Sequence, residues 1–337
     1  MKLLTVAVPA YNAAEFLPQC LDTVIDEHLE VLVINDGSRD NTEAVALAYQ
    51  EKYPEIIRVI SKPNGGWGSG INRAILETRG EYFINLDADD WFRPEGLQTL
   101  IHNLQSHKVD LILAPGFEHS VKTGKEWPIQ FPDGCVYEQE LPFDDLVQPL
   151  NFYFTVHSLV FRTALLQENR IQIDEKFYTD TELIAYPLPF VGNAFVQKEP
   201  LYIYRVDNEG QSISPASMAK HADDMETVAW SMAEWFAKQE GPRTDYYKKI
   251  MLAAAYGLIT YPMGLPPREQ NSWIPRLRRF RTEVLDANES LRDYSQYGLF
   301  ARIALMLNFN RYAAVAVLRN RSLNNRGLAA KLWSIFR

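Results

Sequence analysis

The sequence predicts an α/β fold in which a mainly parallel sheet is flanked by helices and followed by a helical region. Three observations predict it. Strand-like and helix-like segments alternate through the first hundred residues, a predicted strand is a continuous apolar run, and helical periodicity dominates from Ser217 onward. Such alternation is typical of βαβ units, whose parallel strands are buried on both faces.

The predicted elements follow one another at short intervals. The first helix carries a stripe of apolar residues over 13–25, which is the spacing of one helix face. The expected strands cover 3–10, 30–36, 56–61, 81–87, 110–116 and 200–206, with helices over 13–25, 42–53, 68–78, 218–238, 246–261 and 275–285. Pro262, Pro266 and Pro267 mark a break between the late helices, and residues 117–137 show turns and short extended pieces.

Composition excludes several protein classes. Cys20 and Cys135 stand far apart without metal-ligand spacing, which argues against a disulfide scaffold or a zinc site and suits a reducing compartment. Pro9 interrupts the apolar N-terminal run, so we expect no signal peptide, and no apolar run approaches the ~20 residues of a membrane span. The expected location is therefore cytoplasmic.

Charge is unevenly distributed along the chain. Residues 271–337 hold twelve Lys and Arg against four Asp and Glu, a balance of +8, which leaves −17 for the first 270 residues of a chain with net charge −9. Basic residues confined to one end argue against a nucleic-acid-binding protein. They are consistent with a tail that rests on an anionic surface.

Polar residues follow the first three predicted strands, where an open α/β sheet binds its ligands. The ring of Tyr11 can stack on a nucleobase next to Pro9, although a plain turn fits equally well. Asp36 can accept hydrogen bonds from a base or a ribose, whereas Asp40 is better suited to capping a helix. The glycine-rich stretch 62–72 precedes a helix and offers backbone N–H groups to a phosphate, but by itself it is better explained as a flexible connection.

Three carboxylates, Asp87, Asp89 and Asp90, follow the fourth predicted strand. Carboxylates crowded at a strand end cost electrostatic energy unless a cation lies among them. Mg²⁺ and Mn²⁺ take oxygen ligands and share them with substrate phosphates. A solvated acidic turn explains such a stretch in isolation, but its position after an apolar strand of a βαβ series favours a divalent metal site.

In this order and at these spacings, the stretches VAVPAYN, EVLVINDGSRDNT, KPNGGWGSGIN and YFINLDADDWF resemble the family 2 glycosyltransferases of the GT-A fold. The resemblance covers roughly residues 1–210. NGGWGSGIN is similar to the NGGHGS-type loop of a bacterial subgroup, with Trp67 in the place of the histidine. Ile71 stands where many members carry an arginine, so any role of that arginine is absent or moved.

The resemblance implies a domain layout and residue roles. A GT-A catalytic domain would cover residues 1–212, with a nucleotide-binding half at about 1–115 and an acceptor half at about 116–212, followed by a helical region over 213–337. Tyr11 would contact the uracil face, and Asp36 the uracil N3–H or the ribose. Asp87 and Asp89 would form the DxD motif at the metal, Asp89 as the direct ligand and Asp87 nearer the ribose or a metal-bound water, with Asp90 as an accessory charge. The other expected nucleotide-binding residues are Pro9, Asn64, Gly66 and Asn72.

In related enzymes a carboxylate at the start of a later helix serves as the general base. Here Thr179 holds the position of the usual glutamate, so Asp180 is the predicted base and Glu182 the fallback, although acids in a first helical turn are also common for structural reasons. The resemblance also implies acceptor-side or diphosphate-side roles for further residues, although a lone histidine beside apolar residues more often packs than reacts. These residues are His157, Arg205, Gln211 and Ser212.

These assignments predict an inverting hexosyl- or N-acetylhexosaminyl-transferase. Mn²⁺ or Mg²⁺ would neutralise the leaving diphosphate of a UDP-sugar while a carboxylate deprotonates the acceptor hydroxyl. The acceptor would be a glycan or a lipid-linked molecule in cell-surface polysaccharide or cell-wall synthesis. Two alternatives are a catalytically silent nucleotide-sugar or glycan-binding module, which would not need Asp180, and a sugar nucleotidyltransferase, whose basic Gly-rich loop after the first strand is replaced here by PAYNAAEF.

The C-terminal segment is basic and contains apolar residues. Its last residues, RGLAAKLWSIFR, have the composition of a helix that lies in a membrane interface, which would make the protein peripheral on the inner face of the membrane. A helical cap packed on the catalytic domain is the alternative, favoured for the bulk of the region. We expect membrane contact only for residues 325–337.

Overall fold

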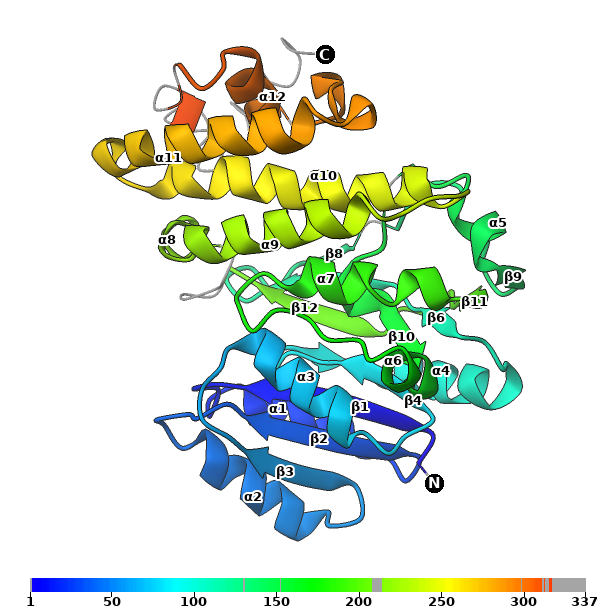
Figure 1. Ribbon diagram of the computed structural model, residues 1–337. Helices are drawn as coiled ribbons and strands as arrows, with labels where there is room; N and C mark the ends of the chain where they lie inside the picture. The colour runs from blue at the N-terminus through cyan, green and yellow to red at the C-terminus, as the bar shows by residue number, and fades with distance from the viewer. Residues whose placement is uncertain are drawn as a thin grey trace. The chain divides into compact units, whose positions relative to one another are not determined.

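An eight-stranded sheet with the order β3-β2-β1-β4-β10-β6-β11-β9 organises the N-terminal part of the chain (Figure 1). Strands β3, β2, β1 and β4 pair in parallel, as do β6 and β11, whereas β10 and β9 run antiparallel to their neighbours. The strands are Leu4–Ala10 (β1), Leu29–Asn35 (β2), Ile57–Ser61 (β3), Tyr82–Asn85 (β4), Leu111–Leu113 (β6), Glu140–Pro142 (β9), Leu159–Arg162 (β10) and Asn193–Val196 (β11).

A smaller sheet has the order β5-β12-β7-β8. Its strands are Trp91–Phe92 (β5), Gly116–Ser120 (β7), Glu126–Pro128 (β8) and Tyr202–Val206 (β12). Since β5 follows β4 directly in the chain, the acidic segment 86–90 leads from the large sheet into the small one. The acidic turn is therefore anchored at both ends by strand pairing.

The structure is a computed structural model that describes residues 2–129, 131–151, 153–207, 214–297, 299–310, 312, 315 and 316. The chain divides into two units, Met1–Glu209 and Gly210–Arg337. Both sheets belong to the first unit. Its helices are α1 (Leu17–Asp22), α2 (Thr42–Lys52), α3 (Trp67–Glu77), α4 (Pro94–Ser106), α5 (Phe143–Val147), α6 (Thr163–Glu168) and α7 (Asp180–Ala185), with 3-10 turns η1 (Val156–Ser158) and η2 (Leu188–Phe190).

Helices cover both faces of the parallel strands. On one face of β1, Leu4, Val6 and Val8 are fully buried in a core that also contains the inward residues of α1 and α4. On the other face a Cβ at Gly70 of α3 would lie 3.1 Å from the Cβ of Pro9, so α3 packs closely on β1 there (Figure 1). This two-sided burial accounts for the continuous apolar runs in the sequence, and the predicted α/β fold class is confirmed.

Register aligns the ends of the parallel strands. Ala10 pairs with Asn35, and Asn35 pairs with Ser61, so the next residue of each strand leaves the sheet at the same edge. The chain runs from β1 outward through β2 and β3 and then returns to β4 on the other side of β1. The carboxyl ends of β1 and β4 therefore flank a topological switch point, where α/β proteins bind ligands.

The second unit is helical over the described residues. Its helices are α8 (Pro215–Lys220), α9 (Ala222–Phe236), α10 (Thr244–Thr260), α11 (Pro267–Phe280) and α12 (Leu299–Met306), with short turns η3 (Tyr261–Gly264), η4 (Arg281–Leu285), η5 (Glu289–Leu291) and η6 (Tyr294–Gln296). The helix expected over 275–285 instead begins at Pro267, because proline fits the first helical turn, and it carries Pro275 inside.

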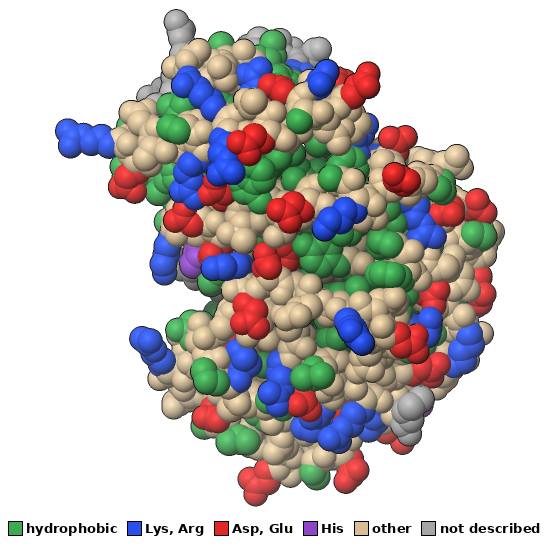
Figure 2. Space-filling view, in the orientation of Figure 1, with side chains coloured by type: hydrophobic (Ala, Val, Ile, Leu, Met, Phe, Trp, Pro, Cys, Tyr) green, Lys and Arg blue, Asp and Glu red, His purple; other side chains and the backbone are tan. Residues whose placement is uncertain are grey.

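Arginines of α11 pair with acidic side chains of the second unit. Arg276 pairs with Asp223 and Glu226 and lies over the ring of Trp273, and Arg279 pairs with Glu283. On the face shown in Figure 2, side chains of both charges are interspersed. Within the described residues, no helix combines the length and the apolar character needed to cross a membrane. Residues 325–337, for which membrane contact is expected, lie outside the described residues.

Candidate functional site

The edge at the end of β1 carries an exposed aromatic ring. Tyr11 is 47% exposed. The next residue, Asn12, has a positive φ of 51°, and its side chain accepts a hydrogen bond from the backbone N–H of Arg39 at 2.8 Å. The backbone N–H of Asn12 also donates to the hydroxyl of Ser38 at 3.1 Å. The loops after β1 and β2 thus hold each other and leave the ring of Tyr11 free to stack.

Asp36, directly after β2, organises the glycine-rich loop. Its carboxylate is buried and accepts hydrogen bonds from the backbone N–H groups of Gly65 (2.9 Å) and Gly66 (2.8 Å) and from Lys62 Nζ (2.6 Å). The side-chain amide of Asn64 donates to the backbone carbonyl of Asp36 at 2.9 Å. The anion bound by these loop amides is therefore Asp36 itself. This gives Asp36 and Asn64 a structural role beside the expected contacts with a nucleotide.

Two glycines let α3 begin where it does. Gly66 precedes the helix with a φ of 86°, which L-residues other than glycine rarely adopt. A Cβ at Gly68 would lie 2.1 Å from the carbonyl oxygen of Asp174, so only glycine allows this close packing. The start of α3 therefore lies directly against the segment that leads to α7.

The acidic turn after β4 is tied to β12. Asp90 is 1% exposed, and its two carboxylate oxygens accept hydrogen bonds from the hydroxyl of Tyr202 and the backbone N–H of Arg205, both at 2.7 Å. The hydroxyl of Tyr202 also accepts a hydrogen bond from the backbone N–H of Asp87 at 3.1 Å. The guanidinium of Arg205 donates to the carbonyl of Asp89 at 2.6 Å and to Gln19. Arg205, expected on the diphosphate side, thus supports the backbone of the turn.

The carboxylate of Asp87 lies between two aromatic side chains. The indole N–H of Trp67 donates to Oδ1 at 2.9 Å, and Nε2 of His157 lies 3.9 Å from Oδ2. The ring of His157, on η1, stacks on Tyr204 of β12 with centroids 4.9 Å apart. His157, expected on the acceptor side, therefore lies beside the acidic turn.

Asp87, Asp90 and His157 form a group that could hold a metal ion, since one ligand atom of each lies within 4.8 Å of the others. Carboxylate oxygens suit Mg²⁺ and Mn²⁺, whereas imidazole is typical of softer divalent ions. Within the described residues, Asp89 is not part of this group, so its role as the direct ligand stays a prediction. Asp90, expected to be an accessory charge, is part of the group.

Burial and mutual repulsion disfavour negative charge around the turn. Burial, and then the charge of Asp87, raises the pKa of Asp89 to about 6. Burial raises the pKa of Asp87, while the hydrogen bond from Trp67 lowers it. Burial, and then the charges of Asp89 and Asp87, raises the pKa of Asp90 well above its usual value. Such a group gains stability when a cation or a proton reduces its charge.

Asp180 lies in the same electrostatic environment. It is the first residue of α7. Burial is the largest cause that raises its pKa to about 6, and the charge of Asp87 also raises it, while local backbone hydrogen bonds lower it in part. The pKa of Tyr204 is raised by burial and by the charges of the three turn carboxylates and Asp180. By contrast, Glu182 is fully buried and accepts the backbone N–H of Asp174 at 2.7 Å. Asp180 therefore fits a base at the site better than Glu182 does.

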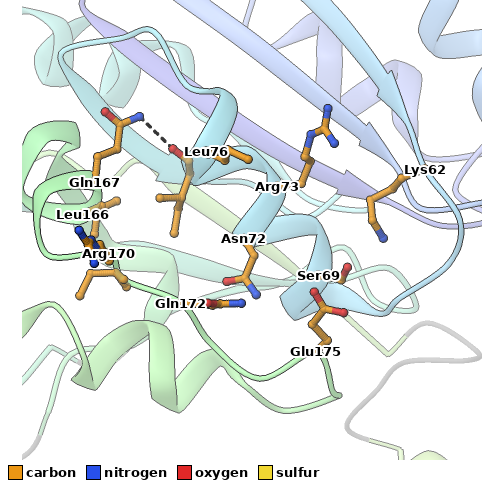
Figure 3. A pocket seen from close by; sticks show the side chains of 12 residues that line it. Lys62, Ser69, Asn72, Arg73, Leu76, Leu166, Gln167, Arg170, Gln172 and Glu175 are labelled. Carbon is orange, nitrogen blue, oxygen red and sulfur yellow. Dashed lines mark hydrogen bonds between the residues drawn. The ribbon is translucent and has the colours of Figure 1, made fainter.

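Asn72 lines a neighbouring cavity of about 590 Å³ on α3. Its amide donates to the carbonyl of Ile173 at 2.8 Å and accepts the N–H of Ile173 at 3.0 Å, which fixes the side chain to the opposite wall. Figure 3 shows Asn72 projecting from α3 toward Gln172, with Ser69 and Glu175 also at the lining of the cavity. The aspartates at 87–90 and 180 are not among the described lining residues. The structure thus gives Asn72 a bracing role, and nucleotide contact by Asn72 stays a prediction.

Comparisons with known proteins identify the family. The family described as "Glycosyl transferase family 2" matches residues 5–168. An uncharacterised glycosyltransferase, the MG025 homolog of Mycoplasma pneumoniae, is 36% identical over 274 residues, which cover 79% of this chain and 82% of that protein. The chain belongs to glycosyl transferase family 2. The aligned segments cover 49%, 23% and 18% of three further relatives, uncharacterised glycosyltransferases of Rickettsia species, so the chain spans half or less of their length.

Solved structures share the fold of this family 2 glycosyltransferase chain. Staphylococcus aureus TarS 1-349, in complex with UDP-GlcNAc, is 20% identical, with a TM-score of 0.64 and coverage of 96% of this chain and 92% of that one. The mannosyltransferase PcManGT from Pyrobaculum calidifontis, in complex with GDP-Man and Mn²⁺, is 15% identical, with a TM-score of 0.54 and coverage of 94% and 86%. The predicted GT-A fold is thereby confirmed.

The sequence-based assignment missed three contributors to this site, Lys62, Trp67 and Tyr202, and it gave the buried Asp90 only an accessory role. Lys62 starts the motif KPNGG, and its charge beside an acidic strand end was a usable signal. Trp67 stands at the one position that differs from the NGGHGS-type loop, which also marked it. Tyr202 carried no local signal, because its contact with Asp90 spans 112 residues. Gln211 and Ser212 lie outside the described residues.

Proposed function

We propose that this family 2 chain is an inverting glycosyltransferase that transfers a hexosyl or N-acetylhexosaminyl group from a UDP-sugar to an acceptor hydroxyl, with Asp180 as the general base. The observation that carries the proposal is the joint position of two acidic elements. The turn 87–90 leaves β4 beside the switch point of the sheet. The start of α3 holds Asp87 through Trp67 and packs on the segment that leads to Asp180, whose pKa the charge of Asp87 raises. The carboxylates of the turn can hold a cation against the donor diphosphate, and the carboxylate of Asp180 can take the proton of the acceptor hydroxyl.

Each part of the site then has a chemical task. Tyr11 stacks on the base, and the loop held by Asp36 lines the nucleotide. Asp87, with Asp89 or with Asp90 and His157, holds a divalent cation, which when bound neutralises charge on the leaving diphosphate. Asp180 accepts the proton of the acceptor hydroxyl as that oxygen attacks the anomeric carbon. A pKa of about 6 suits a base that works near neutral pH.

The donor class rests on the fold neighbours and on the exposed ring of Tyr11. The TarS structure contains UDP-GlcNAc and the mannosyltransferase structure contains GDP-Man with Mn²⁺, which supports a nucleotide-sugar donor and a divalent cation here. We further propose that the acceptor is a glycan or lipid-linked molecule of the cell surface, that residues 1–212 form the catalytic part, and that residues 325–337 contact the membrane. Equal flotation with liposomes of the full chain and of a chain lacking residues 325–337 would count against that contact.

Release of UDP tests the activity directly. The full chain is incubated with each of a panel of UDP-sugars, MnCl₂ and a mixture of cell-surface glycans, and UDP is measured. We expect release with one donor, loss of release with EDTA, and at least ~100-fold slower release by Asp180→Asn, since a general base contributes about 10²–10⁴-fold. Asp245→Asn is the matched control, because that side chain is 91% exposed in the second unit.

Binding separates this function from the alternative of a silent module. Calorimetry should give Asp180→Asn the same affinity for UDP with Mn²⁺ as the unmodified chain. Binding of UDP without release under any condition would favour the silent module. Joint loss of UDP binding and release in Asp180→Asn would show that Asp180 belongs to the nucleotide pocket instead.

A further inference from the structure

Trp67 connects the glycine-rich loop to the acidic turn. It is the first residue of α3, directly after Gly66, whose N–H binds Asp36. Its own indole N–H donates to Oδ1 of Asp87 at 2.9 Å across 20 residues of sequence. Gly66 and Trp67 together therefore join the loop after β3 to the ends of β2 and β4, at the edge where the proposed function needs them.

The chemistry of indole makes this contact directional. The indole nitrogen is a donor only, so Asp87 can only accept in this hydrogen bond, and tryptophan cannot ligate a metal through that nitrogen. Because Oδ1 is occupied by the indole, the carboxylate is turned so that Oδ2 lies on the side of His157, 3.9 Å from Nε2. The indole thus selects which carboxylate oxygen faces the candidate metal group.

We propose that Trp67 is a positioning residue that holds Asp87 in the orientation required to bind the cation of a metal–nucleotide complex. This inference rests on the proposed function and deepens it. It assigns to position 67 a task that does not depend on contact with the substrate. The indole N–H of Trp67, rather than the bulk of the ring, performs this task.

The packing around Trp67 makes it suitable for this task. Its neighbour Gly68 lies against the carbonyl of Asp174, and Gly66 lies beside Lys176. Tyr202 holds the backbone N–H of Asp87 from the other side at 3.1 Å. With its backbone N–H and one carboxylate oxygen both fixed, Asp87 is held at two points, and removal of the indole N–H leaves its side chain free to rotate.

The test measures how strongly Mn²⁺ increases the affinity of the full chain for UDP, by calorimetry with and without MnCl₂. Trp67→Phe keeps an aromatic ring and removes the N–H, Trp67→His keeps a ring N–H, and Trp230→Phe in α9 is the matched control. We expect Trp67→Phe to reduce the Mn²⁺-dependent gain at least ~10-fold while its metal-free UDP affinity stays within about 2-fold. Trp67→His should retain the gain within about 3-fold, and Trp230→Phe should leave it unchanged.

A purely structural role would lower both affinities and leave their ratio unchanged. Retention of the full gain by Trp67→Phe, or loss of the gain in Trp67→His as well, would overturn the inference. If Trp67→Phe does not fold, Trp67→Leu is measured instead, since leucine has neither a hydrogen-bond donor nor a metal ligand: a retained gain refutes the role of the indole N–H, and a lost gain at unchanged metal-free affinity supports it. An unmodified chain that shows no Mn²⁺-dependent UDP binding overturns the proposed function, and the inference with it, which distinguishes the two failures.

Discussion

Asp180 occupies the first position of the short helix α7, where the charge of Asp87 acts on it. Burial is the largest cause of its raised pKa of about 6, and the charge of Asp87 adds to it. Two local hydrogen bonds, from the backbone of Asp180 and Thr181, lower the pKa in part. A structural first-turn acid needs no such environment, whereas a general base near neutral pH does.

The pH dependence of transfer follows from this pKa. A base acts only when unprotonated, so kcat should be constant above pH 7 and fall as pH decreases through about 6, about tenfold for each further pH unit. Steady-state UDP release between pH 5 and 8 measures the profile. Asp89 has a similar raised pKa of about 6, and it provides the rival explanation for an acid limb.

The concentration of Mn²⁺ separates the two carboxylates. Protons and metal compete for a metal ligand, so an acid limb caused by Asp89 moves to lower pH when Mn²⁺ is raised tenfold. A limb caused by Asp180 stays in place at saturating metal. A limb that follows the metal concentration would contradict the assignment of Asp180 as the base.

At the scale of elements, α3 determines how the site is assembled. Its N-terminus holds Asp87 through Trp67, its start packs on the segment before α7, and its buried face packs on β1 and β2. Gly68 makes the second contact possible. Helix propensity and packing predict opposite outcomes for a larger residue at this position.

Gly68→Ala decides between these two effects. Propensity alone would stabilise α3 by about 1 kcal/mol. The new Cβ would lie 2.1 Å from the carbonyl oxygen of Asp174, however, so the backbone must move, which costs about 1–3 kcal/mol or more. We expect a net decrease in the free energy of unfolding, measured with urea, together with slower UDP release as Asp180 is displaced.

Leu76→Ala is the control on the same helix, because that side chain is 75% exposed. It should change the free energy of unfolding by no more than about 0.5 kcal/mol. A Gly68→Ala variant at least as stable as the unmodified chain would show that the segment around Asp174 adapts freely, and α3 would then not set the position of α7.

Local patterns were sufficient for the parallel part of the fold. The apolar runs of β1 and β2 and the glycines and proline between elements identified the βα alternation, and common register at the strand ends then brought Tyr11 and Asp36 together. The antiparallel β10 was not identifiable, since four residues within a mixed stretch carry no clear period. Helix α4, by contrast, is absent from the expected elements although the sequence does indicate it. Its buried residues have the spacing of one helix face: Leu97, Leu100, Ile101 and Leu104.

The candidate site was predictable where residue type and position suffice, and less so where side chains meet across the fold. Carboxylates at the end of β4 imply a cation on chemical grounds alone. The partners of those carboxylates lie far away in the sequence: Trp67 is 20 residues from Asp87, and Arg205 is 115 residues from Asp90. No local pattern encodes such contacts. For the same reason the sequence could not show that Asp36 binds the loop amides.

For the whole molecule, the acidic cluster is a cost to stability at neutral pH. The pKa of Asp89 in the folded chain, about 6, lies above its usual 3.8. Between these values the folded chain binds more protons than the unfolded chain, so stability decreases as pH rises through this window. Active sites commonly retain such unfavourable charge because function requires it.

Asp89→Asn should therefore be more stable than the unmodified chain by about 1–3 kcal/mol at pH 7.5, since a raised pKa of this size corresponds to that range. The difference should shrink toward zero as pH falls from about 6 to 4, where the carboxyl is protonated anyway. His157, whose pKa burial lowers to about 4, titrates in both proteins and cancels in the comparison. Urea unfolding at several pH values measures the difference, and saturating Mn²⁺ should reverse it by stabilising the unmodified chain more. Equal stability of the two proteins at pH 7.5 would mean that solvent already relieves the repulsion, and the cluster would then gain little from a cation.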